Sequence, residues 1–150
     1  MAHPAGRIVV GVDGSPESLE AIRWAARQAE LSGCQLEAIS AWKFPASSGF
    51  EFGGEADNDW AGNARTVLDA ALLQALGKGS EATALVERGH PAQVLVAAAV
   101  GAEMLVVGSR GHGGLVGMLL GSVSEYVTAH ATCPVVVIHG DSTESSRPDA

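Results

Sequence analysis

A glycine-rich segment carrying serine and arginine side chains is the part of this sequence best suited to hold a ligand. It runs from Gly108 to Ser124 and reads GSRGHGGLVGMLLGSVS. Successive backbone N–H groups in a glycine loop form a concavity that binds anions, and the free N–H groups at the start of a following helix add to it. The segment therefore predicts a phosphate-binding site.

Polar side chains in this segment could complete such a site, and each also has a plain structural role. Ser122 and Ser124 can cap the following helix or hydrogen-bond a phosphate oxygen, and their spacing alone favours neither role. Arg110 would supply positive charge for a phosphate, and His112 could contact a terminal phosphate. For both of these side chains a solvated loop position is the simpler interpretation.

Short apolar runs alternate with helical patterns along the chain, which is typical of β-α-β units and a mainly parallel sheet. Strands are expected at residues 7–13, 34–42, 81–89, 103–109 and 134–139. Helices are expected within residues 14–33, 60–76, 90–101 and 122–131. In the first helical segment Ser15 can act as the cap, Pro16 suits the first position, and Glu17 complements the positive end of the helix dipole.

Helical spacing of apolar residues predicts which side of the first two helices faces the core. In the first helix these residues are Leu19, Ile22, Ala25, Ala26 and Ala29. In the second they are Ala64, Val67, Leu68, Ala71, Leu72 and Ala75.

Five strands and four helices in this order predict an α/β fold. We expect a doubly wound five-stranded parallel sheet in the order 3-2-1-4-5, a Rossmann-like or flavodoxin-like three-layer sandwich. Strands one and four are neighbours in that order, and the loops that follow them open a crevice beyond their carboxyl ends. Open α/β sheets bind their ligands there, and the loops DGSPES and GSRGHGG would line the crevice.

Length and charge limit the classes of function. With 150 residues, 47% of them hydrophobic, we expect a single domain over residues 1–140 and a flexible polar tail over 141–150. The net charge of -8 argues against a broad basic face for nucleic acid or an anionic membrane. No signal-peptide pattern or membrane-spanning apolar run is present, so a cytoplasmic protein is expected. Cys34 and Cys133 form no CxxC or zinc spacing and are expected to be reduced, buried thiols.

Two common phosphate motifs are absent from the sequence. No GxxxxGK[ST] occurs, which excludes the usual loop of P-loop NTPases, and no GxGxxG opens a helix after the first strand. Instead, Gly108, Gly111, Gly121 and Ser122 match the spacing G-x2-G-x9-G-[ST]. With this signature the chain resembles the ATP-binding branch of the universal stress protein family. The segments RIVVGVDGSPESLEAIRWA, MLVVGSRGHGG and LLGSVSEYVTAHATCPVVVI extend the resemblance over nearly the whole chain.

The resemblance implies an ATP site and a role for each matching residue. Asp13 would hold the ribose hydroxyls, Gly11 and Val12 would form one wall, and Ala41 would meet adenine through its main chain. Ala41 is smaller than the aliphatic residue often found at that place. The remaining ATP-binding residues are implied to be Val107, Gly108, Ser109, Arg110, Gly111, Gly121, Ser122, Val123 and Ser124. ATP would bind with Mg²⁺ or Mn²⁺ bridging its phosphates, with no metal ligand among the protein side chains.

The implied function is that of an ATP-binding regulator or sensor of stress responses. No catalytic base for ATP hydrolysis is evident at the matching positions, so binding without efficient turnover is expected. A weak ATPase or phosphotransferase, and a partner-binding module that uses a cyclic nucleotide or none, are the alternatives.

Two further segments carry expectations. The strand from Pro134 to His139 would be a sheet edge, and a homodimer through that edge fits both the need to cover it and the family resemblance. The aperiodic segment from Lys43 to Asp59 is longer than an ordinary loop between a strand and a helix. It is either a mobile surface loop or a lid over the ligand.

Overall fold

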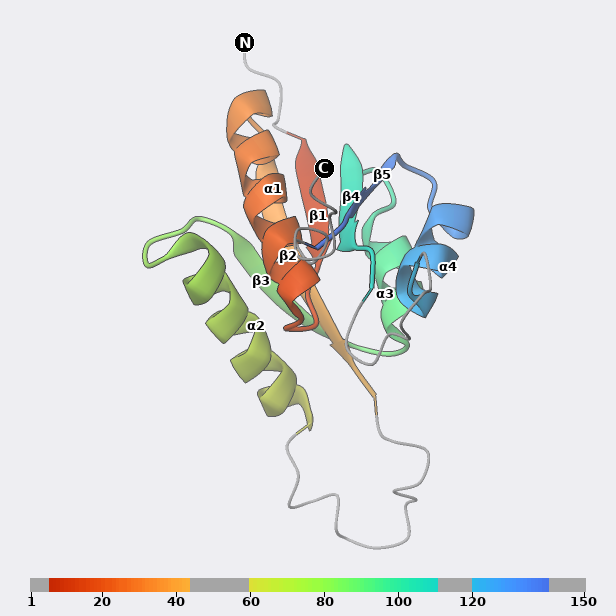
Figure 1. Ribbon diagram of the computed structural model, residues 1–150, viewed down its shortest axis with the longest axis horizontal. Helices are drawn as coiled ribbons and strands as arrows, with labels where there is room; N and C mark the ends of the chain where they lie inside the picture. The colour runs from red at the N-terminus through yellow and green to blue at the C-terminus, as the bar shows by residue number, and fades with distance from the viewer. Residues whose placement is uncertain (1–5, 44–59, 111–119, 141–150) are drawn as a thin grey trace, which may run out of the picture.

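A single parallel sheet with helices on both faces forms the molecule (Figure 1). The computed structural model describes residues 6–43, 60–110 and 120–140. Its elements are β1 (Arg7–Gly11), α1 (Pro16–Ser32), β2 (Gln35–Trp42), α2 (Trp60–Leu76), β3 (Thr83–Arg88), α3 (Pro91–Ala98), β4 (Met104–Gly108), α4 (Ser122–His130) and β5 (Val135–Ile138). The strand order is β3-β2-β1-β4-β5 with parallel pairing throughout, which confirms the predicted topology.

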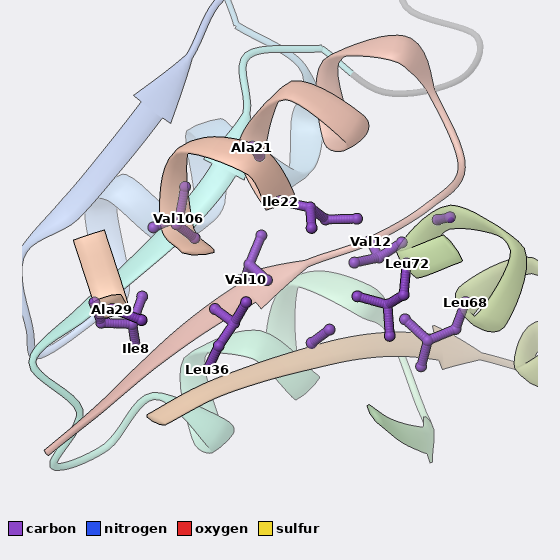
Figure 2. Close-up of a cluster of buried hydrophobic side chains, with 13 residues drawn as sticks. Ile8, Val10, Val12, Ala21, Ile22, Ala29, Leu36, Leu68, Leu72 and Val106 are labelled. Carbon is purple, nitrogen blue, oxygen red and sulfur yellow. The ribbon is translucent and has the colours of Figure 1, made fainter. Parts of the chain in front are cut away.

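Alternate residues of the strands face two separate hydrophobic layers. Ile8 and Val10 of β1 point to α1 and α2, whereas Val9 points to α3 and α4. Figure 2 shows the first layer, in which side chains from β1, β2 and β4 meet Ile22 of α1 and Leu68 of α2. Because the central strands are buried on both faces, their sequences are continuous apolar runs. The result is the expected three-layer sandwich.

Helix α1 begins and ends with the local signals seen in the sequence. Ser15 is the N-cap, and its hydroxyl accepts a hydrogen bond from the Ser18 N–H at 3.2 Å. Gly33 adopts φ 76° and donates its N–H to the carbonyl of Ala29, which ends the helix. The inward face of α1 is as predicted for Ile22, and it also buries Ala21.

The predicted inward face of α2 is wrong at one position. Leu68, Ala71 and Leu72 are buried, but Val67 is 42% exposed. Apolar residues surround most of this helix, so their spacing defines its inward face poorly. The expectation of buried cysteines is also wrong, because Cys34 and Cys133 are both half-buried; neither forms a disulfide.

The point where the strand order reverses lies between β1 and β4. These strands pair in register, with Val10 opposite Val106. The chain leaving β1 turns into α1 on one face, and the chain leaving β4 leads to α4 on the other (Figure 1). None of the helices within the described ranges is long and apolar enough to cross a membrane.

Candidate functional site

The first part of the candidate site is the turn between β1 and α1. Strand β1 ends at Gly11, two residues earlier than expected, so Val12 and Asp13 lie in the turn. Val12 is buried and donates its N–H to the Ile39 carbonyl of β2 at 2.9 Å. Gly14 adopts φ 85°, a left-handed conformation that favours glycine. The turn is therefore anchored to the sheet directly before it exposes Asp13.

The carboxylate of Asp13 is oriented by the start of α1. Its Oδ1 accepts a hydrogen bond from the Ser15 N–H at 2.8 Å, while Asp13 itself is exposed. Ser15 is 2% exposed and is held in place as the helix cap. An aspartate bonded to the backbone two residues on is a common turn device. Here it also places a negatively charged side chain at the rim of the β1 end.

The second part of the site joins the end of β4 to the start of α4. Ser109 is buried and donates its N–H to the Ile138 carbonyl of β5 at 2.8 Å. The carbonyl of Ser109 accepts the Gly121 N–H at 2.6 Å and the Ser124 hydroxyl at 2.8 Å. These two bonds bring residues 108–110 and 121–124, the described parts of the two glycine half-sites of the signature, together at one carbonyl group.

The role of Ser124 follows from these bonds. Its hydroxyl has one proton, which is shared between the Ser109 carbonyl and, at 3.2 Å, the Gly121 carbonyl. Ser124 is 2% exposed, whereas Ser122 at the first position of α4 is exposed. Of the two roles that the spacing left open, Ser124 therefore has a structural one in this conformation.

The amino end of α4 has no side-chain cap, unlike the amino ends of α1 and α3. The N-cap residue is Gly121, and no side chain caps the helix there. By contrast, Ser15 caps α1 and the His90 ring caps α3. The first turn of α4 thus keeps backbone N–H groups and the positive end of the helix dipole available for an anion.

The bare backbone of Gly108 has a packing reason. A methyl group added there would lie 2.7 Å from Cβ of Glu17 and 3.1 Å from its main-chain carbonyl carbon. Gly11 is similarly close to Leu95 of α3, at 2.7 Å from its Cδ1. At Gly108 the neighbouring atoms are Cβ and backbone of α1, which cannot easily move, whereas at Gly11 the end of the Leu95 side chain would have to shift. Both glycines therefore allow a helix to approach the carboxyl end of a strand.

Arg110 is half-buried in the loop after β4, next to Glu17. Its Nη2 lies 3.7 Å from Oε2 of Glu17, and the two side chains are 31% and 14% exposed. The sequence predicts only that Glu17 favours the start of α1, and it gives no sign that Glu17 lies near the loop after β4. Its approach to Gly108 and Arg110 depends on how α1 packs across the sheet, which residue spacing does not reveal.

The remaining predicted residues fall on the same edge of the sheet or outside the described ranges. Val107 is buried in β4, and Val123 is half-buried in α4. Ala41 is half-buried near the carboxyl end of β2, two residues beyond the Ile39 carbonyl that anchors Val12. Gly111 lies outside the described residues, together with His112, the segment 44–59 and the tail 141–150. Most of the predicted set is thus assembled around the ends of β1, β2 and β4.

A groove lies on the α3 face of the sheet. Its volume is about 610 Å³, and it is lined by side chains of β2, β3 and α3, among them Glu37, Leu85 and Val94. Its lining includes Arg7 at the amino end of β1 and Arg88 at the carboxyl end of β3, but none of residues 11–15, 108–110 or 120–124.

The alternation of strands and helices and the strand order define a Rossmann-like α/β protein, in which the order reverses between β1 and β4. The model of the universal stress protein family matches residues 4–139, and the chain belongs to this family. A universal stress protein of Mycolicibacterium smegmatis is 36% identical over 143 residues, covering 89% of this chain and 48% of that protein. One from Mycobacterium tuberculosis is 37% identical over 144 residues, covering 91% and 46%. The chain thus spans about half the length of these relatives.

Solved structures agree with the family and the fold. A universal stress protein in complex with cAMP is 30% identical, with a TM-score of 0.64, and the match covers 89% of this chain and 96% of that one. The protein from Archaeoglobus fulgidus in complex with dAMP is 25% identical, with a TM-score of 0.62, and the coverage is 89% and 97%. A third structure, of the protein MJ0577, has a TM-score of 0.74 at 22% identity, covering 97% and 98%, and supports the fold alone.

Proposed function

We propose that this chain binds an adenine nucleotide between the ends of β1 and β4 and acts as an ATP-binding regulator of a stress response. The observation that carries the proposal is the uncapped first turn of α4, joined to the end of β4 through the Ser109 carbonyl. Such a turn binds phosphate through its backbone N–H groups. The family relatives whose structures contain cAMP and dAMP support an adenine nucleotide as the ligand.

In this proposal the predicted residues act in three groups. Asp13 holds the ribose hydroxyls from the rim of the β1 turn, where the Ser15 N–H orients its carboxylate. Gly11, Val12 and the main chain of Ala41 form the base and wall side of the crevice. The phosphates lie against the remaining residues, namely Val107, Gly108, Ser109, Arg110, Gly111, Gly121, Ser122, Val123 and Ser124. Ser124 acts there by donating its proton to the Ser109 carbonyl, which holds the loop, rather than to a phosphate.

A divalent cation is part of the proposed ligand rather than of the protein. Across residues 6–43, 60–110 and 120–140 no group of three or more His, Cys, Asp or Glu side chains could hold a metal ion. Mg²⁺ is commonly held by nucleotide phosphates and water with few protein ligands. We therefore propose that ATP enters as its Mg²⁺ or Mn²⁺ complex, with the phosphates supplying most of the coordination.

The uncovered edge of β5 supports a homodimer. Strand β5 is the last in the sheet, and its four residues are half-buried and apolar. Pairing of Pro134 to His139 with a second copy would cover the backbone groups of that edge. We further propose that residues 1–140 act as one domain and that the protein works in the cytoplasm.

Calorimetric titration with ATP, AMP and cAMP, each with and without Mg²⁺, tests the proposed ligand. We expect Gly121→Glu to weaken nucleotide binding more than about tenfold, because a carboxylate would occupy the start of α4 where phosphate is proposed to bind. Ala129→Glu adds the same charge at an exposed position near the other end of α4 and serves as the control. Equal binding by Gly121→Glu and the wild type would contradict the site.

The same preparation tests the enzymatic alternative. Mg²⁺-dependent release of phosphate that persists through purification and is lost in Asp13→Ala would favour a weak ATPase or phosphotransferase. Binding of cAMP in preference to ATP and AMP would instead favour the cyclic-nucleotide module. Absence of binding for all three nucleotides would leave the nucleotide-independent partner module.

A further inference from the structure

Glu17 occupies the corner where the carboxyl ends of β4 and β5 meet the first turn of α1. Methyl groups added to Gly108 and Gly140 would lie 2.7 Å from its Cβ and 2.9 Å from its Oε2, respectively. The side chain is 14% exposed. Backbone on both sides therefore limits where this carboxylate can go.

The carboxylate of Glu17 is paired with Arg110, in the loop after β4. The distance of 3.7 Å between Arg110 Nη2 and Glu17 Oε2 is near the outer limit of an ion pair, and Arg110 remains 31% exposed. A guanidinium has five N–H donors in a planar fork, so part of this group can turn to another anion. An anion at the start of α4 and Glu17 would then compete for the same cation.

Negative charge exceeds positive charge around this part of the loop. Within residues 11–17, 108–110 and 120–125 the acidic side chains are Asp13, Glu17 and Glu125, and the basic side chain is Arg110. Glu125 lies in the first turn of α4 and offsets part of the positive helix end. A highly charged phosphate chain would therefore enter an acidic surrounding.

We infer that Glu17 sets the phosphate-charge preference of the nucleotide site by competing for Arg110. The inference rests on the function proposed above and names the form of nucleotide that the site accepts. Repulsion by a fixed carboxylate grows with the number of charges on the ligand. The site therefore favours a nucleotide of low phosphate charge, that is, a monophosphate or a triphosphate neutralised by a divalent cation.

Replacement of Glu17 by glutamine tests this inference because the amide keeps the shape of the side chain and removes its charge. Adenosine, AMP, ATP with EDTA and ATP with excess Mg²⁺ are titrated calorimetrically into wild type and Glu17→Gln. For charges roughly 7 Å apart, we expect a gain per unit of phosphate charge that faces the carboxylate of between about threefold, at the dielectric constant of water, and about fiftyfold, at that of a protein surface. The gain in affinity should be largest for metal-free ATP and smaller for AMP and Mg²⁺-ATP. For adenosine the affinity should change by less than about twofold.

A matched variant and a double mutant separate this effect from net charge. Glu20→Gln changes the same charge on the same helix, but Glu20 is paired with Arg23 at 2.8 Å and should leave the affinity order unchanged. In an Arg110→Gln background the gain from Glu17→Gln should shrink, because the shared cation is gone. Thermal unfolding of each variant shows whether it remains folded.

The possible results give a clear decision. An equal gain for adenosine and ATP would overturn the inference and indicate a packing effect of Glu17. A loss of Mg²⁺-ATP affinity in Glu17→Gln would overturn it by showing that the carboxylate supports Arg110 or the metal. If the wild type binds nucleotides and Glu17→Gln binds each of them with the same affinity, this inference is overturned but the proposed function is not. Absence of any nucleotide binding by the wild type would overturn it together with the proposed function.

Discussion

Removal of the Ser124 hydroxyl is the most direct test of how the start of α4 is joined to the end of β4. In the wild type this hydroxyl donates to the Ser109 carbonyl at 2.8 Å from a position that is 2% exposed. Ser124→Ala deletes that bond, but the Ser109 carbonyl keeps the Gly121 N–H at 2.6 Å. No buried acceptor is left empty. The expected cost is therefore that of one ordinary hydrogen bond, about 1 kcal/mol of unfolding free energy.

This loss is measurable by urea and thermal unfolding followed by circular dichroism. For a domain of this size about 1 kcal/mol corresponds to a fall in Tm of roughly 2–4 °C. Nucleotide affinity should fall as well, because the start of α4 keeps only one of its two hydrogen bonds to the Ser109 carbonyl. Ser122→Ala is the matched control, since Ser122 is exposed at the first position of the same helix. It should leave Tm within about 1 °C of the wild type.

The reasoning would be refuted by either of two results. Ser124→Ala with wild-type stability would show that the hydroxyl does not hold the loop. An equal fall in Tm for Ser122→Ala and Ser124→Ala would show that both serines act only through the start of the helix. In that case the link to the Ser109 carbonyl has no special part in the site.

Two further predictions concern β5 and the residues before it. Val137→Pro should convert a homodimer to monomer, as measured by sedimentation equilibrium. The Pro134 and Ile138 carbonyls accept hydrogen bonds from Leu105 and Ser109, so by alternation along the strand the Val137 N–H faces the open edge, and proline removes that donor. A dimer that survives this change would place the interface elsewhere. Burial raises the pKa of the Cys133 thiol, so less thiolate is present in the folded protein at a given pH. In a Cys34→Ser background, the midpoint of the pH–rate curve for alkylation should therefore lie higher in buffer than in urea; coincident midpoints would argue against it.

The arrangement of strands and helices was predictable because two local signals agree along the chain. Continuous apolar runs such as β4 indicated strands buried on both faces, and Ser15 with Pro16 marked the start of α1. Right-handed connections then restrict the order in which five such strands can lie. At Val67 the same method fails, because α2 has apolar residues on several sides and helical spacing cannot rank them.

The candidate site was predictable in outline but not in its contacts. The spacing of the glycine signature predicts that Gly108, Gly121 and Ser124 lie near one another, because the carboxyl end of β4 leads to the amino end of α4. It could not show that the Ser124 proton is used by the Ser109 carbonyl, or that Arg110 pairs with Glu17. Both contacts depend on packing between segments that lie far apart in the sequence. The phosphate roles of the site residues remain predictions that nucleotide titration must test.

The opposite, amino-terminal edge of the sheet is held together by Arg7. Its guanidinium donates to the Ala98 carbonyl at 2.8 Å and the Val100 carbonyl at 2.7 Å, and it also pairs with Glu37 of β2 at 3.3 Å. The main-chain carbonyl of the same residue accepts the Glu103 N–H at 2.8 Å. One residue thus ties the end of α3, the entry to β4 and the second strand to β1. The amino ends of β1, β2 and β4 and the end of α3 are therefore cross-linked to one another through a single residue.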